Sequence, residues 1–116
     1  MSPTIWELVN TALTPLGVPM AEGSYIPGDN EAYPDLYMVY FMVSLDPEQF
    51  ADDQEIERTE LVQVSIYKRD SLIGLPDVIG AMKAGGFTFS GGRELDYDPD
   101  TRHHAIAFDF EYLENL

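Results

Sequence analysis

Three aspartates near the C-terminal end of the chain have the spacing of a calcium-binding loop. Asp96, Asp98 and Asp100 match positions 1, 3 and 5 of such a loop, whose carboxylate oxygens coordinate the ion. Thr101 then occupies position 6, which requires glycine, and Ala107 occupies position 12, which requires a bidentate glutamate. Asp and Pro are also ordinary turn residues. We therefore expect a hairpin turn here and no metal ion.

A second group of acids lies in the middle of the chain. Residues 46–60 hold seven acidic side chains and one base. Asp52, Asp53 and Glu55 could bind a divalent cation through oxygen ligands, but nothing in the sequence fixes the geometry that such a site requires. A loose acidic run is typical of a solvated loop. We expect a loop, and we count these three residues among the candidates for a protein interface.

The two histidines are neighbours in the sequence. On a strand, His103 and His104 point to opposite faces, so they cannot chelate one ion together. His104 falls on the apolar face and is expected in the core or an interface, whereas His103 is expected to face solvent. No nucleophile or orienting carboxylate can be assigned to either. No serine has the Gly-x-Ser-x-Gly pattern, and the glycines match no phosphate-binding fingerprint. We expect no enzyme and no cofactor.

The length, composition and charge of the chain exclude several further kinds of site and partner. The 116 residues fit a single domain, 1–116, and the absence of cysteine excludes thiolate metal sites and disulfides. A net charge of −15 repels nucleic acid and anionic membranes. No apolar run is long enough to span a bilayer, and no secretory signal is visible. We expect a soluble intracellular protein.

Apolar periodicity predicts an α+β fold in the order α-β-β-β-α-β-β. The sheet is expected to be mostly antiparallel, with four to five strands and two helices packed on one face. The predicted elements are an N-terminal helix that Pro15 limits and Gly17 closes, strands at 20–26, 36–45 and 57–68, a helix from 75 or 76 to 84, and strands at 86–95 and 102–112.

The strand at 36–45 is apolar on both faces, which is typical of a strand covered on both sides. One face should meet the helices, and the other is predicted to contact a second subunit. The candidate interface residues on this strand are Tyr37, Val39 and Phe41. Trp6 joins them because it lies off the apolar stripe of the first helix and tryptophan is enriched in binding hot spots.

In order and spacing, these segments resemble the tail terminator (tail-to-head joining) proteins of long-tailed bacteriophages. The resemblance covers nearly the whole chain. It rests on the N-terminal helix with its exit at Leu16 to Pro19, on Tyr37 to Phe41, on Asp53 to Ile56 followed by Val62 to Ile66, on Ile79 to Phe87, on Asp98 to His104, and on the aromatic ending Phe110 to Tyr112.

The resemblance implies a virion protein that assembles in the host bacterial cytoplasm and forms a hexameric ring at the head-proximal end of the tail. The implied partners are further copies of the chain, the tail tube protein and a head-completion protein. DNA would pass through the ring without specific binding, and no reaction is implied.

Two other interpretations stay open. One is a small monomeric adaptor or assembly chaperone that binds another virion protein. The other is a metal-dependent hydrolase that uses the acids at 52–55 or 96–100.

Overall fold

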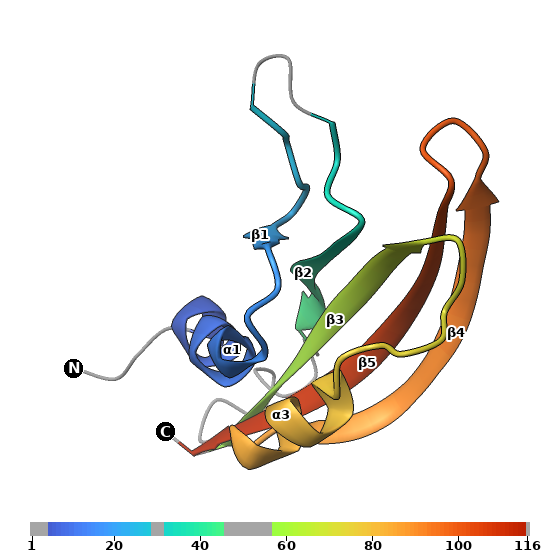
Figure 1. The fold of residues 1–116 in the computed structure, drawn as a ribbon. Helices are drawn as coiled ribbons and strands as arrows, with labels where there is room; N and C mark the ends of the chain where they lie inside the picture. The colour runs from blue at the N-terminus through green and yellow to red at the C-terminus, as the bar shows by residue number, and fades with distance from the viewer. Residues whose placement is uncertain (1–4, 29–31, 46–56, 116) are drawn as a thin grey trace.

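The computed structural model describes residues 5–28, 32–45 and 57–115 of the chain (Figure 1). The elements follow the predicted order α-β-β-β-α-β-β, so the α+β class is confirmed. They are α1 (Ile5–Leu13) with a 3-10 turn η1 (Thr14–Leu16), β1 (Met20–Glu22), β2 (Leu36–Leu45), β3 (Glu57–Arg69), α3 (Val78–Ala84), β4 (Thr88–Asp98) and β5 (His103–Asn115).

The five strands form one sheet in the order β1-β2-β3-β5-β4. The pairs β2–β3, β3–β5 and β4–β5 are antiparallel. β1 instead pairs parallel to β2, with Met20 opposite Met38, so the sheet is mixed.

Both helices cover the same face of the sheet, as the sequence predicts (Figure 1). Burial of apolar side chains between the helices and the sheet is the main favourable term in folding. The fully buried residues come from every layer: Val9 and Leu13 of α1, Val78 and Met82 of α3, and Met38, Val62, Val64, Ile66 and Phe110 of the strands.

The first helix ends at the proline and glycine that the sequence predicts. Pro15 lies inside the η1 turn, and Gly17 adopts the left-handed conformation at φ 68°. The Gly17 N–H donates to the Thr14 carbonyl oxygen at 3.1 Å, which satisfies one of the free carbonyls at the helix end.

The second helix begins later than predicted. It starts at Val78 and not at Leu75 or Pro76, because the Asp77 side chain caps it by accepting a hydrogen bond from the Gly80 N–H at 2.9 Å. Pro76 therefore lies outside the helix, where its missing N–H costs nothing.

The last two strands form a hairpin that is longer than predicted. β4 runs to Asp98 and β5 starts at His103, so the turn is shorter than the predicted 96–101. The pairing of β4 with β5 shifts register between Phe89 and Gly91, where Gly91 has φ 149°.

β3 carries buried residues on both faces of the sheet. Val62, Val64 and Ile66 are fully buried under the helices. On the opposite face Ser65 and Gln63 are also buried, and the Gln63 amide donates to an Asp109 carboxylate oxygen at 3.0 Å. β3 is the central strand of the sheet, so neighbours on both sides shield it.

Candidate protein-binding groove between the two helices

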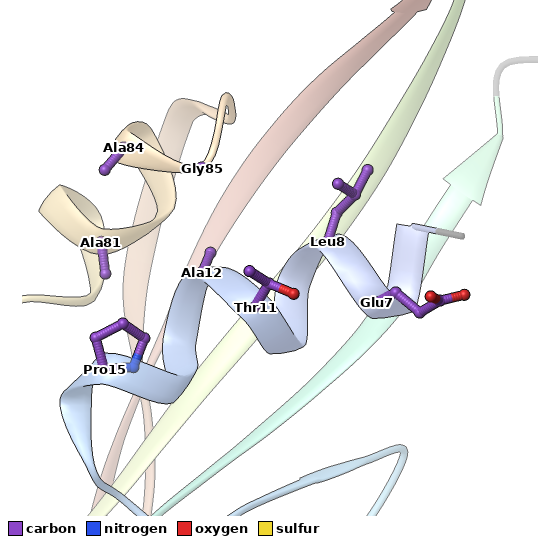
Figure 2. Close-up of a pocket in the computed structure, with 8 residues that line it drawn as sticks. All are labelled: Glu7, Leu8, Thr11, Ala12, Pro15, Ala81, Ala84 and Gly85. Carbon is purple, nitrogen blue, oxygen red and sulfur yellow. The ribbon is translucent and has the colours of Figure 1, made fainter. Parts of the chain in front are cut away.

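A groove of about 550 Å³ opens between the two helices (Figure 2). Its size lies in the range of pockets that accept small molecules or side chains. Eight residues line it: Glu7, Leu8, Thr11 and Ala12 of α1, Pro15 of η1, Ala81 and Ala84 of α3, and Gly85 at the end of that helix.

Small side chains create the groove. Ala81 and Ala84 lie three residues apart, so they share the face of α3 that lies toward α1. Neither side chain extends far enough to fill the space between the helices. At Gly85 the helices approach closely, because a β-carbon there would lie 2.8 Å from that of Ala12. The groove is the space left beside this contact.

The lining is mainly apolar and offers little for chemistry. Glu7 is its one ionisable side chain and the Thr11 hydroxyl is its other polar group. An apolar side chain that enters such a groove is stabilised by about 25 cal/mol for each Å² it removes from water. The arrangement is therefore suited to burying a partner's apolar side chain.

A cluster of aromatic side chains covers the sheet face away from the helices. Tyr37 stacks on Tyr67 with ring centroids 4.7 Å apart and lies 5.0 Å from Tyr25 and 5.4 Å from Tyr33. Burial, reinforced by Tyr67 and Tyr33, raises the pKa of Tyr37 to about 12.

This cluster corrects the prediction for the strand at 36–45. Tyr37 and Val39 are only 8% and 6% exposed, because Tyr25 and Tyr33 of the chain's own segment before β2 lie over that face. The prediction that a second subunit must cover these two residues is therefore wrong. Phe41 is half-buried.

Arg69 of β3 binds the segment that carries Tyr25 and Tyr33, through contacts with Asp35. Its N–H donates to the Asp35 carbonyl at 2.9 Å, and its guanidinium pairs with the Asp35 carboxylate. The guanidinium also donates to the Thr101 carbonyl oxygen at 2.9 Å. The segment, the end of β3 and the β4–β5 turn are thus joined at one point.

The structure reverses the predicted roles of the two histidines. His103 is only 2% exposed and donates through Nε2 to the Pro34 carbonyl oxygen at 2.8 Å. His104 is half-buried beside Tyr97, with ring centroids 4.5 Å apart. His104 does share a face with the core, but it is the second residue of β5, next to the β4–β5 turn, where it pairs in register with Lys68.

Trp6 is less available than the sequence suggests. Its ring packs against the core, with its centroid 6.3 Å from that of Tyr40, and the residue is half-buried. The other interface candidates, Asp52, Asp53 and Glu55, lie outside the described residues.

The aspartates at 96–100 form the end of β4 and the turn after it. Asp98 Oδ1 accepts from the Asp100 N–H at 2.9 Å, and the Asp98 carbonyl accepts from the Arg102 N–H at 2.7 Å. These bonds are those of a hairpin turn. Among the described residues, no three acidic or histidine side chains form a group that could hold a metal ion.

No protein-family model matches this chain, and no curated protein matches its sequence. In the part of the chain that the structure describes, no helix is both long and apolar enough to cross a membrane.

Sequence reasoning missed the groove. The signal that could have found it is the pair of alanines three residues apart on α3, followed by Gly85. Small residues at this spacing leave one side of a helix without bulk. They become a groove only when a second helix lies beside that side, and this tertiary contact is not encoded in the α3 segment itself.

Proposed function

We propose that this chain is a structural subunit of a long-tailed bacteriophage or prophage tail, acting as a tail terminator that forms a ring on the tail tube and joins the tail to the head. The observation that carries this proposal is the open apolar groove between α1 and α3. An assembling subunit needs surfaces of this kind, since interfaces between copies bury apolar side chains in shaped recesses.

Two further features agree with the proposal. The order of elements is that of the α+β subunit implied by the resemblance. The net charge of −15 suits a protein that surrounds passing DNA, because like charges repel and the DNA would not adhere. A solved ring with a basic lumen would contradict the second point.

A monomeric adaptor or assembly chaperone is the second candidate. The burial of Tyr37 and Val39 favours it, because β2 needs no second copy to cover its far face. In this interpretation, the same groove would hold a segment of another virion protein in a one-to-one complex.

Light scattering coupled to size-exclusion chromatography separates the two candidates. The 13.0 kDa chain would be measured over a concentration series, alone and with tail tube protein. A tail terminator gives a species of six copies, and negative-stain images show it as a ring on the end of the tube. A chain that stays monomeric at the highest concentration, with tube protein present, contradicts the tail terminator proposal and supports the adaptor.

A further inference from the structure

β4 is the outer strand at one edge of the sheet (Figure 1). It pairs with β5 on one side, and among the described residues no backbone hydrogen bond from outside the β4–β5 hairpin reaches residues 88–97. Every second residue of such a strand turns its N–H and C=O groups outward. The opposite edge, β1, has three residues, whereas β4 has 11. β4 is therefore the edge that an extended segment could pair with.

Two exposed aromatic side chains lie on this edge strand. Four large apolar side chains are exposed among the described residues, and two of them are Phe89 and Tyr97, at 38% and 46%. Phe89 is in register with Phe110 of the core, and the Tyr97 ring centroid lies 4.5 Å from that of His104. Residues 104 and 110 of one regular strand share a face. Both exposed rings therefore lie on the sheet face that bears the helices.

A third ring lies between them. Gly92 is in register with Phe108, and a β-carbon on Gly92 would lie 2.9 Å from Cδ1 of the Phe108 ring. That ring therefore takes up the space beside Gly92. Phe108 is half-buried, and its ring centroid lies 6.0 Å from that of Phe89. Phe89, Phe108 and Tyr97 together form an apolar strip along the edge of the sheet, which we call the edge strip.

The charge of β4 decides which partner suits this edge. Three exposed acids, Glu94, Asp96 and Asp98, and one base, Arg93, give the strand a net charge of −2. Arg93 already pairs with Asp109 of β5 at 3.6 Å. A second copy would bring another acidic strand and a further charge of −15, which repel this edge. Charge complementarity favours a segment of a different protein that contains Lys or Arg.

We propose that β4 binds an extended, basic segment of a different protein, which adds to the sheet as one further strand. Glu94 is in register with Ile106, so it lies on the same face as the edge strip, between Gly92 and Tyr97. A matching segment has apolar residues beside Phe89 and Tyr97 and a Lys or Arg beside Glu94. Cross-strand pairs of both kinds stabilise a sheet. The backbone hydrogen bonds give affinity, and the alternating side chains give specificity.

Two irregularities in β4 set the extent of the contact. The register with β5 shifts between Phe89 and Gly91 and again between Leu95 and Asp98. Bulges of this kind hinder the pairing of edge strands. The stretch 91–95 between them pairs with β5 without interruption, so the new backbone hydrogen bonds are centred there. The segment extends past this stretch to reach the exposed ring at each end.

A synthetic peptide of about nine residues, the length from Phe89 to Tyr97, is the probe. Valine and threonine alternate in it, and a lysine replaces the central valine, so that it fits in either strand direction. Added to the isotope-labelled protein, it should shift the backbone amide signals of 91–95 and slow their hydrogen exchange. The same peptide with glutamate in place of lysine should bind at least about tenfold more weakly.

Two methylated peptides test the backbone pairing. One carries N-methyl groups on its odd-numbered residues and the other on its even-numbered residues. In an added strand, alternate N–H groups face β4, so one of the two peptides should lose at least about tenfold in affinity while the other binds as before. Equal binding of the two would show that no strand is added, and would overturn the proposal.

Glu94→Lys tests the charge contact on the protein side. It should weaken binding of the lysine peptide at least about tenfold and strengthen binding of the glutamate peptide. The matched control is Glu22→Lys, which changes the net charge equally at the exposed end of β1, on the opposite edge of the sheet. It should change binding by less than about twofold, because salt screens a distant exposed charge. Both variants should melt within about 2 °C of wild type, since both side chains are exposed.

Several results would overturn the proposal. They are no binding of the lysine peptide at about 1 mM, equal binding of the glutamate peptide, equal effects of Glu94→Lys and Glu22→Lys, and amide shifts in the α1–α3 groove in place of β4. If the 91–95 amides of the protein alone became protected as its concentration rose, a second copy would be the occupant, and the proposal would also be wrong. The contact goes beyond the proposed function and does not depend on ring formation, so light scattering tests the tail terminator proposal separately.

Discussion

A β-carbon built on Gly85 would lie 2.8 Å from the β-carbon of Ala12, a separation that real side chains do not adopt. The two helices of the fold therefore touch at a point where one of them must have glycine. Gly85 has φ −85°, which any residue can adopt, so the requirement comes from space and not from backbone conformation. This contact fixes the separation of α1 and α3 and hence the width of the groove beside it.

Gly85→Ala should lower the free energy of unfolding by about 1–3 kcal/mol, the usual cost of adding a methyl group to a well-packed contact. Urea denaturation measures the effect through the shift of the midpoint. Ala84→Ser is the matched control, because it adds one heavy atom to an exposed neighbour on the same helix. Equal stability of Gly85→Ala and wild type would mean that the helices do not pack as closely as described.

Removing the cap of α3 should cost a similar amount. In Asp77→Ala, the Gly80 N–H loses the acceptor that now lies 2.9 Å away, and we expect a loss of about 1 kcal/mol. Asp77→Asn keeps a capping oxygen and should stay within about 0.5 kcal/mol of wild type. Chemical denaturation of all three proteins is the measurement. A loss in Asp77→Asn as large as in Asp77→Ala would indicate that charge, and not the capping bond, is what matters.

The fold class could be predicted from the sequence because most helices and strands show a local apolar pattern. The period of α1 and the apolar run of β2 are local patterns, and the structure confirms both. The parallel pairing of β1 was not predictable in this way. Three residues, Met20 to Glu22, contain no information about strand direction, which depends on the path of the chain before Leu36.

The candidate interface was harder to predict, because exposure depends on what the rest of the chain covers. Tyr37 and Val39 were expected on a subunit surface, yet the segment that carries Tyr25 and Tyr33 buries them. That segment has no periodic pattern, so its position against the sheet could not be derived from its residues. The groove likewise arises from two helices that are far apart in the sequence.

His103 is buried beside the aromatic cluster and His104 is half-buried, so substitutions of the two histidines test which of them contributes to stability. His103→Ala should lower the free energy of unfolding by about 2–3 kcal/mol, because it leaves a cavity and removes the hydrogen bond to Pro34. His104→Ala should cost less than about 1 kcal/mol, since that ring is only half-buried. The two neighbours control for each other, and thermal and urea unfolding both measure the difference. The order of the two effects would be reversed if His104 were the buried histidine and His103 the one that faces solvent.

The raised pKa of Tyr37 predicts a loss of stability in alkali. In the unfolded chain this phenol ionises near pH 10, and in the folded protein its pKa rises to about 12 because burial disfavours the phenolate. Between these values the unfolded state binds fewer protons than the folded state, so stability falls as the pH rises. The loss attributable to Tyr37 should reach about 1–3 kcal/mol by pH 12. Urea unfolding of wild type and Tyr37→Phe at several pH values isolates it, since the other six tyrosines are common to both. Parallel pH dependence of the two proteins would mean that Tyr37 ionises as easily as a tyrosine in water, and that the aromatic cover over β2 is open to solvent.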